Sequence, residues 1–505
     1  MAGEPVPGTA GVPAAATSDG VALAWVGTIA VAVVAVLLVL SPLYGFHRDE
    51  LYFIVAGRHP ALGYADQPSL TPLLSAGAVA LLGVSPTAIR ILPALSMGVL
   101  IVLAGLTARD LGGSRRAQAL AALVLALSGF LAAGHLDSTA TFDLLAWGLI
   151  LWLLVRLLAG ADPRLWIVLG VVAGIDLENK DIILFLAAGI AAGLLLARRW
   201  EVIRSPWAWG AVAIAGIIWL PNLAWQAANG WPQLEMARSI AGNADENRGK
   251  LLVELLLLAG PLLFPVTLVG AWWLLRSPGA RAWRTIGYGL VAAIVIVFVI
   301  GGKSYYIVGF YPPLVAGGAI VLDGWLGRGR RLFRGAVFGS AAAVSGALVA
   351  LLVLPVLPPA TLAETPIPSI YKESAEQVGW PELAKAVENA VATLPAADRQ
   401  RAVVLTANYG EAGALELLGS GLPPVYSGHT GYWSWGPPPA GRNVVVLVGN
   451  WSIGYWTQFF GACRPAGSVD NGIGLDNQEQ GGSIFACYRL LAPWEELWPR
   501  LRNLG

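Results

Sequence analysis

Charged residues are scarce in this sequence. Asp, Glu, Lys and Arg make up 12% of the 505 residues, about half of the roughly 25% found in soluble domains. Hydrophobic residues make up 56%, and the mean hydropathy is +0.65. This composition excludes an ordinary soluble domain and predicts an integral membrane protein.

An excess of charge of either sign is also missing. There are 32 basic and 31 acidic residues, which give a formal net charge of +1. A nucleic-acid-binding chain is expected to carry a strongly basic balance. We therefore predict no nucleic-acid partner.

Histidine and cysteine are rare too. The four histidines are too scattered for a zinc set, so we predict no metal site: His47, His59, His135 and His429. The two cysteines, Cys463 and Cys487, stand 24 residues apart in the polar C-terminal region. We predict that they form a disulfide, which would require an oxidising compartment.

Long apolar runs are what the sequence has in abundance. Eleven are near the length that crosses a bilayer, about 17 to 25 residues. They lie at 21–43, 86–107, 117–134, 139–159, 164–177, 181–197, 206–223, 251–275, 284–301, 305–323 and 335–357. Residues 1–20 lack a basic n-region, so we predict a disordered cytoplasmic tail before a retained first span.

Arginines cluster in every second loop between these runs. The clusters lie within 109–116, 156–164, 198–204, 276–284 and 328–334, and all of them fall on one side. The positive-inside rule assigns that side to the cytoplasm. The prediction is a multi-pass plasma-membrane protein with a cytoplasmic N-terminus, a large first outer loop at 44–85 and an outward-facing C-terminal region.

The composition changes after the last apolar run. Residues 358–505 follow a proline-rich linker and include an amphipathic stretch at 380–394. Two apolar runs at 401–406 and 443–449 are typical of buried strands. We therefore predict a membrane domain at 21–357 and a small extracytoplasmic α/β domain at 358–505.

Two adjacent carboxylates, Asp49 and Glu50, follow the first span and open the long outer loop. One interpretation is that they are interfacial charges paired with Arg48 and Arg58. The other is a general base, because an acid beside the membrane can take a proton from an attacking hydroxyl. We favour the base.

Asp143 lies about one turn inside the fourth predicted span, whereas Asp137 is expected in the solvated loop before it. An ionisable residue within a span is costly unless it faces water or a partner, so Asp143 is a functional candidate. Alternatively, it is a first-turn carboxylate that the helix dipole stabilises.

Basic residues are sparse on the predicted outer side, where Lys180 and Lys303 stand out. Two glycines precede Lys303 and allow a close approach of a ligand, and a lysine can neutralise a phosphate. Tyr305 and Tyr306 follow directly. A lysine that snorkels beside an aromatic belt is the competing interpretation.

The order of short motifs between residues 40 and 325 resembles a known family. The motifs are Arg48-Asp49-Glu50-x-Tyr52, Leu62-Gly63-Tyr64-Ala65-Asp66-Gln67-Pro68, Thr141-Phe142-Asp143, Pro221-Asn222-Leu223-Ala224-Trp225-Gln226, Asn229-Gly230-Trp231-Pro232, Lys303-Ser304-Tyr305-Tyr306 and Tyr311-Pro312. They look like the bacterial protein mannosyltransferase and lipid A aminoarabinose transferase family of C-type glycosyltransferases. The aminoarabinose branch has a lysine before a Pro-Pro in the first loop, whereas this chain has Gln67-Pro68-Ser69, so the resemblance favours another branch.

The resemblance implies an all-α polytopic membrane protein with about 11 transmembrane helices, the C-type glycosyltransferase fold and the added α/β domain. The catalytic residues carried over are Asp49, Glu50 and Asp143. The substrate-binding residues that we predict are Arg58, His59, Asp66, Gln67, Lys180, Lys303, Tyr305 and Tyr306. No cofactor is required, although a divalent cation stays open.

The implied activity is an inverting transfer of a sugar from a polyprenyl-phosphate donor to an acceptor hydroxyl on the outer face of the membrane. The acceptor is a protein, a lipid or a glycan. The main alternative is a lipid or sugar transporter or flippase, which usually carries ionisable residues near the bilayer midplane. A noncatalytic envelope scaffold is a third alternative, although it leaves the acids at the helix ends without a purpose.

Overall fold

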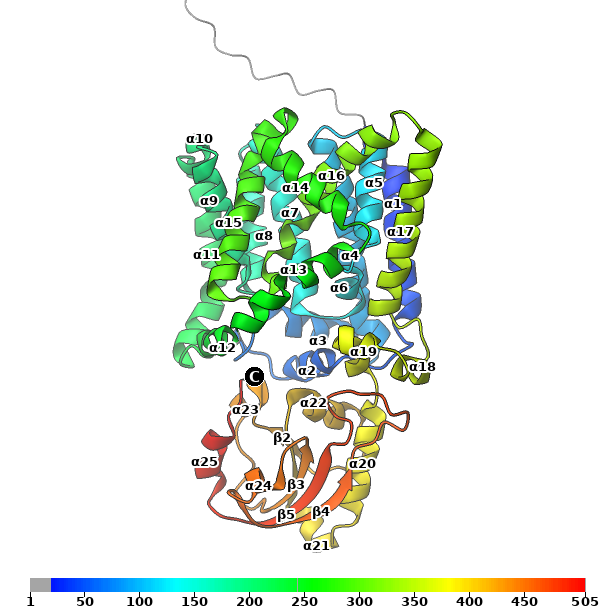
Figure 1. The fold of residues 1–505 in the computed structure, drawn as a ribbon. Coiled ribbons are helices and arrows are strands. Elements are labelled where there is room, and N and C mark those ends of the chain that lie inside the picture. Colours follow the sequence, from blue (N-terminus) through cyan, green and yellow to red (C-terminus); the bar gives the residue numbers. More distant parts are fainter. Residues whose placement is uncertain (1–19, 243, 505) are drawn as a thin grey trace, which may run out of the picture.

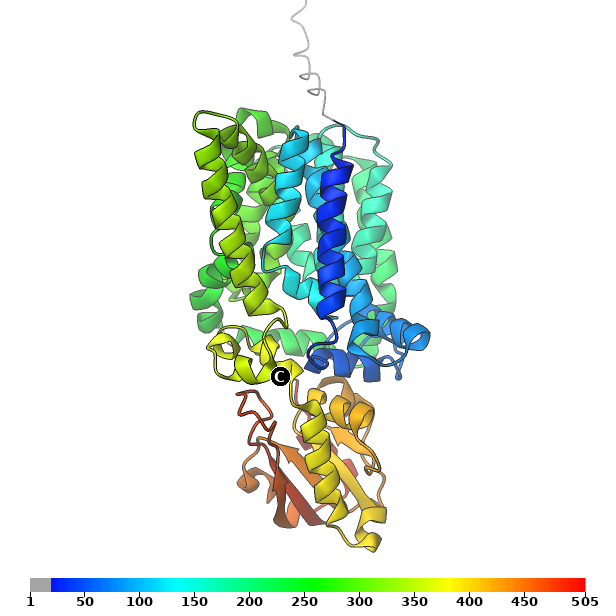
Figure 2. The same ribbon diagram turned by 90° about the vertical axis from the view of Figure 1, so that its right-hand side faces the viewer.

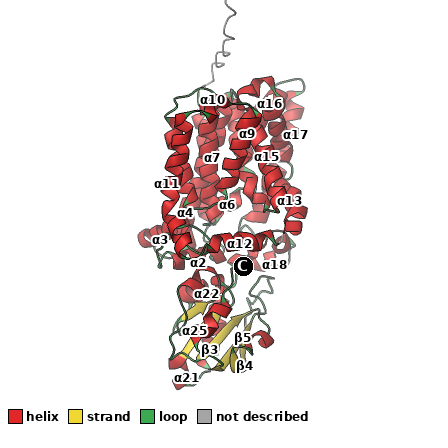
Figure 3. Ribbon diagram, turned by 90° about the vertical axis from the view of Figure 1, so that its left-hand side faces the viewer, coloured by secondary structure: helices red, strands yellow, loops and turns green. Residues whose placement is uncertain are grey.

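The computed structural model describes residues 20–242 and 244–504. The predicted tail at 1–20 lies outside the described residues, apart from Gly20. A bundle of helices stands above a smaller domain that contains the described strands (Figures 1 and 3). The membrane part is therefore all-α, as predicted.

Seven helical segments of the described residues are long and apolar enough to cross a membrane. Their helices are α1 (Leu23–Leu40), α4 (Pro86–Asp110), α7 (Thr139–Leu158), α11 (Pro206–Ala228), α15 (Arg284–Ile300), α16 (Tyr311–Leu326) and α17 (Arg331–Val353). The 3-10 turns η1 (Pro278–Trp283) and η2 (Ser304–Phe310) precede α15 and α16. A bent pair, α13 (Ala244–Ala259) and α14 (Phe264–Arg276), makes an eighth crossing if it counts as one span.

Each of the eleven predicted segments contains a helix, but four differ from a simple span. The third is broken into α5 (Arg115–Ala126) and α6 (Leu131–His135), and the eighth bends by 103° between α13 and α14. The fifth and sixth form α8 (Leu165–Leu177) and α9 (Ile183–Leu196), which have only 13 and 14 residues. The chain thus has fewer full-length spans than apolar runs.

The arginine-rich loops meet at the end of the bundle away from the C-terminal domain. Arg156 approaches Asp110 at 4.0 Å, and Arg116 pairs with Asp323 at 2.9 Å. Arg199 donates hydrogen bonds to the carbonyls of Leu158 and Ala282. Short α10 (Trp200–Ile203) lies at this end (Figure 1).

The other end of the bundle carries the predicted outer loops. Loop 44–85 forms α2 (Arg48–Ala56) and α3 (Leu70–Leu82), and α12 (Pro232–Ala241), α18 (Pro359–Ala363) and α19 (Ile367–Ile370) lie at the same level (Figure 1). Asn179 joins two of these loops, because it accepts a hydrogen bond from Thr71 at 2.7 Å and donates one to the Thr139 carbonyl at 2.9 Å. Both loops therefore meet at one place.

The C-terminal domain is built on a five-stranded sheet of order β2-β1-β3-β5-β4. The strands are β1 (Ala402–Thr406), β2 (Val425–Ser427), β3 (Val444–Gly449), β4 (Phe460–Ser468) and β5 (Ser483–Leu490). The β2-β1-β3 part is parallel, and β5 and β4 are antiparallel additions. β1 and β3 cover the two strands that the sequence predicts.

Helices cover this sheet and connect it to the bundle. They are the turn η3 (Lys372–Gln377), α20 (Trp380–Ala392), α21 (Ala396–Arg401), α22 (Tyr409–Leu418), α23 (Thr430–Ser434), α24 (Ile453–Trp456), α25 (Trp494–Leu497) and the turn η4 (Trp498–Leu501). Figure 2 shows α20, in yellow, along one side of the domain. Leu51 and Ile54 of α2 share a buried apolar cluster with Trp380 and Leu383 of α20, so the domain is packed onto the first outer loop.

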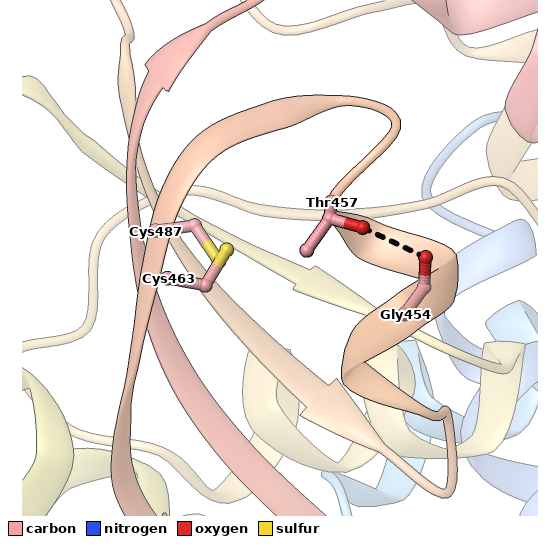
Figure 4. The surroundings of a disulfide bond; sticks show 4 residues. All are labelled: Gly454, Thr457, Cys463 and Cys487. Carbon is pink, nitrogen blue, oxygen red and sulfur yellow. Dashed lines mark hydrogen bonds between the residues drawn. A yellow bond between two sulfur atoms is a disulfide. The ribbon is translucent and has the colours of Figure 1, made fainter.

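Cys463 and Cys487 face each other across β4 and β5 and are joined by a disulfide. Figure 4 shows this bond beside the turn of α24, in which Thr457 donates a hydrogen bond to the Gly454 carbonyl. The bond holds the edge strand β4 to the rest of the sheet.

Candidate active site

Asp49 stands at the second position of α2, and its backbone is fixed by a capping box. The Nδ1 atom of His47 accepts the Asp49 amide at 3.2 Å, and the carboxylate of Glu50 accepts the His47 amide at 2.7 Å. Such reciprocal bonds satisfy amides that a helix start leaves free. The Asp49 side chain is partly exposed, and its Oδ1 accepts a hydrogen bond from the Tyr409 hydroxyl at 2.6 Å.

Glu50 does not face the same space as Asp49, which corrects its predicted catalytic role. It is fully buried, and Arg90 binds it in a bidentate pair at 2.7 and 2.8 Å. It also accepts the Asp137 amide at 3.0 Å. Because its two oxygens together accept four hydrogen bonds, Glu50 holds the loop and has no free position for a substrate.

Asp66 lies close to Asp49 on the first outer loop. Its Oδ1 accepts the Tyr52 hydroxyl at 2.7 Å. Burial raises the pKa of Asp66 to about 7, with a further rise from the charge of Asp49 and an opposing effect of the Tyr52 hydrogen bond. The neighbouring Gln67 is buried, and its amide nitrogen has no hydrogen-bond partner among the described residues.

Lys180 and Lys303 meet over one aromatic ring. Their Nζ atoms lie 4.9 and 5.9 Å from the centre of the Tyr305 ring, and Tyr306 packs edge-on against Tyr305 at 5.0 Å. Burial lowers the pKa of Lys303, and the charges of Lys180 and Lys372 lower it further. Two ammonium groups that disfavour each other's charge form a favourable place for an anion such as phosphate.

Asp143 is buried on α7 and interacts electrostatically with Lys180. It is 4% exposed and accepts a hydrogen bond from Trp147 at 3.0 Å, and Asp176 of α8 is close enough to interact with it. Burial lowers the pKa of Lys180, and the charges of Asp143, Asp49 and Asp176 oppose this. Lys180 thus interacts electrostatically with both acids that the sequence singled out.

Arg58 and His59 point elsewhere, which corrects their predicted place in the site. The His59 ring stacks on Trp435 of the C-terminal domain at 4.3 Å. The charge of Arg58 acts on Glu416 and Tyr432 of the same domain. Both side chains are exposed at the seam between the first outer loop and the domain.

Asp137 is also placed differently from the prediction. It is 2% exposed, and its Oδ2 accepts the Ser75 hydroxyl at 2.5 Å. Burial raises its pKa to about 8, and the Glu50 charge adds to the rise. This carboxyl therefore joins the buried Glu50–Arg90 group and not the solvent.

The sequence did not connect Asp49 with two residues that lie around it. Tyr409 and His429 come from the C-terminal domain, and Arg48 lies 4.8 Å from the centre of the Tyr409 ring. Burial lowers the pKa of His429 to about 4, and the Arg48 charge adds to this while the Asp49 charge opposes it. Tyr409 and His429 are 360 and 380 positions from Asp49, so only the folded structure reveals them.

One group of side chains in the described part of the chain has metal-ligand spacing: His47, Glu373 and Glu376. Nε2 of His47 lies 2.7 and 3.4 Å from the two carboxylates. Because Nδ1 accepts the Asp49 amide, the proton of a neutral ring is on Nε2, where it blocks metal binding. Arg48 and Lys372 lie 3.6 Å from Glu376, so the group fits an ionic clamp better than a metal site.

Comparisons with known proteins concern the family and the fold of the chain. A family model described as dolichyl-phosphate-mannose-protein mannosyltransferase matches residues 66–225. The crystal structure of ArnT from Cupriavidus metallidurans bound to undecaprenyl phosphate superimposes with a TM-score of 0.58 at 14% identity, covering 92% of this chain and 98% of ArnT. The chain has the C-type glycosyltransferase fold.

A second solved structure with this fold is also similar to the chain. The arabinofuranosyltransferase AftD from Mycobacteria matches with a TM-score of 0.51 at 16% identity, covering 93% of this chain and 40% of AftD. A search of curated proteins found no match. The family match and both structures confirm the resemblance to C-type glycosyltransferases that the sequence motifs indicate.

Proposed function

We propose that this protein transfers a sugar from a polyprenyl-phosphate donor to an acceptor hydroxyl at the outer face of the plasma membrane. The observation that carries the proposal is the position of Lys180, which lies over Tyr305 beside Lys303 and within the electrostatic reach of both Asp49 and Asp143. An anion-binding pair next to a partly exposed carboxylate is what this reaction requires.

In the proposed step, Oδ2 of Asp49 takes the proton of the acceptor hydroxyl while its oxygen attacks the anomeric carbon. The bond from that carbon to the phosphate oxygen breaks, and the polyprenyl phosphate leaves with the electron pair. The products are the glycosylated acceptor, with inverted configuration, and the lipid phosphate. Because the attack and the departure occur on opposite faces of the sugar, one base and one anion site are sufficient.

Lys180 and Lys303 bind the phosphate and stabilise the charge that grows on it as the bond breaks. Electrostatic stabilisation of this kind is worth about 3 kcal/mol for a single donor in an enclosed site. Asp143 and Asp176 hold Lys180 in place and preserve its charge, which makes Asp143 a positioning residue. The two lysines supply the positive charge that stabilises the leaving phosphate, so the proposed step needs no cofactor. A divalent cation at the phosphate is the alternative source of this charge.

The orientation is also part of the proposal. The arginine-rich loops at one end of the bundle favour the cytoplasm, and the disulfide at the other end favours an oxidising compartment. Together they support a multi-pass protein whose candidate site and C-terminal domain face outward. The acceptor is then an envelope protein, lipid or glycan.

The test is the Asp49→Asn variant, assayed with membranes from a strain that lacks this chain as the source of donor and acceptor. We expect transfer to fall to background, while binding of undecaprenyl phosphate stays within about twofold of wild type. Asp245→Asn is a matched control, because Asp245 is exposed on α13. Turnover by Asp49→Asn at the wild-type rate would reject the assignment of the base.

A further inference from the structure

The C-terminal domain places one of its own side chains on the proposed base. Tyr409 is the first residue of α22, and its hydroxyl donates to Oδ1 of Asp49 at 2.6 Å. Oδ2 of Asp49 makes no hydrogen bond within the described part of the chain. Tyr409 therefore holds Oδ1 of this carboxylate, whereas Oδ2 is available to a substrate.

Tyr409 is itself well fixed. A second capping box begins α22, in which the Asn408 side chain accepts the Glu411 amide at 2.9 Å and Glu411 accepts the Asn408 amide at 3.2 Å. The Tyr409 ring lies 4.9 Å from the rings of both Tyr52 and His429. The hydroxyl is thus aimed at Asp49 by its helix and by neighbouring rings.

Close packing of α22 on α2 makes this hydrogen bond possible. A Cβ atom added at Gly413 would lie 2.9 Å from the Cβ of Leu51 and 3.0 to 3.1 Å from its backbone. A Cβ atom added at Gly410 would lie 2.9 Å from the Cβ of Arg48. Real contacts are not that short, so glycine at both positions lets the two helices approach closely.

The charged and titratable groups that act on this contact come from several elements. His47 precedes α2 and Arg48 is on it, Asp66 is on the first outer loop, Lys180 on the turn after α8, Tyr305 on η2, and His429 on the domain. None of these groups donates a hydrogen bond to the Asp49 carboxylate in the described residues, whereas Tyr409 does. Tyr409 is therefore the group whose removal changes Asp49 most directly.

We propose that the C-terminal domain completes the catalytic site through Tyr409, a positioning residue whose hydroxyl orients Asp49 and stabilises its charged form, so that Oδ2 receives the acceptor proton. This inference rests on the proposed function. It assigns the domain a part in the reaction at Asp49, and it makes docking of α22 on α2 a condition for turnover.

The test is a rate-versus-pH profile of Tyr409→Phe, measured with the same deletion-strain membranes. Loss of the donated hydrogen bond favours the protonated carboxyl, so we expect the acid limb to move up by about one pH unit and kcat to fall about tenfold. The KM for the lipid donor should stay unchanged, because the phosphate lies at the lysines. Tyr488→Phe is the matched control, since the hydroxyl of Tyr488 on β5 accepts a hydrogen bond from Arg464 of β4 and makes none with Asp49.

Gly413→Leu provides a second variant that keeps the Tyr409 hydroxyl but separates the two helices. We expect the same displacement of the acid limb. A profile of either variant that superimposes on that of wild type, or a lower rate without displacement of the limb, would overturn the inference. Failure of the proposed function is distinguishable, because the wild-type chain would then show no transfer or Asp49→Asn would remain active. Failure of this inference alone leaves the wild type active and Asp49→Asn inactive.

Discussion

At the scale of single residues, two adjacent carboxylates have opposite surroundings. Asp49 and Glu50 look equivalent in the sequence, but only the folded chain shows that Arg90, forty positions on, binds Glu50 with two hydrogen bonds. The sequence also singles out Lys180, Lys303 and Tyr305, and the structure brings these three side chains together. It could not reveal the burial of Asp137, because that depends on Ser75 from another helix.

The buried Arg90–Glu50 pair gives a prediction for stability. Arg90→Met leaves an unpaired carboxylate in the interior, so we expect a loss of about 3–5 kcal/mol of unfolding free energy. Thermal unfolding of the purified protein in detergent measures this loss. The double variant Arg90→Met with Glu50→Gln should recover part of it, and an unchanged unfolding temperature of Arg90→Met would contradict the structural role of the pair.

The lysines give a prediction for donor binding. Lys180→Met and Lys303→Met should each weaken binding of undecaprenyl phosphate about tenfold, the equivalent of one charge-assisted hydrogen bond. Titration of the purified variants with this lipid provides the measurement. Lys385→Met on the surface of the C-terminal domain is the control, and equal affinities for all three variants would show that the phosphate binds elsewhere.

At the scale of elements, apolar length predicted helices but not their breaks. The run at 251–275 looks like one span, yet it bends by 103° between α13 and α14. Gly260 has a φ of +86° there, and the proline after it has no amide to continue the helix. The free carbonyls before the bend are used by other elements, because the Tyr311 hydroxyl binds Ala259 and the Gly129 amide binds Leu258.

Glu411, in the capping box that begins α22, predicts that the stability of the fold depends on pH. Burial, with the Glu479 charge, raises the pKa of Glu411 from 4.5 to about 8. Between these values the unfolded chain has lost a proton that the folded chain keeps, so stability falls as pH rises from about 4.5 to 8. Between pH 5 and pH 8 we expect the unfolding temperature of Glu411→Gln to fall less than that of wild type, by about 5 °C. Differential scanning at pH 5 and 8 tests this, with exposed Glu496→Gln as the control; an equally steep fall in Glu411→Gln would refute it.

At the scale of the whole molecule, the division into two ends was predictable and the joining of the two domains was not. Alternating arginine-rich loops already separate the ends, and the structure gathers those loops together. The sequence contains no signal that α22 packs on α2, because an interface between residues hundreds of positions apart depends on shape. The predicted site therefore included residues of the membrane domain and no residue of the C-terminal domain, although Tyr409 of that domain contacts Asp49.

The orientation in the membrane can be measured with single cysteines. We expect a membrane-impermeant maleimide to label Lys385→Cys in intact cells, because this position on α20 is exposed and the proposed orientation places the C-terminal domain outside. Arg330→Cys, in the arginine-rich loop after α16, should react only after permeabilisation. The native cysteines are bonded to each other and do not compete. The reverse labelling pattern would place the candidate site in the cytoplasm.

Sugar transfer by this protein can be observed in the cell envelope itself, by mass spectrometry of glycans, glycolipids and glycoproteins from a strain that lacks the chain. We predict that one sugar substituent disappears in this strain, returns with the wild-type chain and stays absent with Asp49→Asn. An envelope that keeps every substituent without the chain, or regains the missing one with Asp49→Asn, would contradict a glycosyltransferase that uses Asp49.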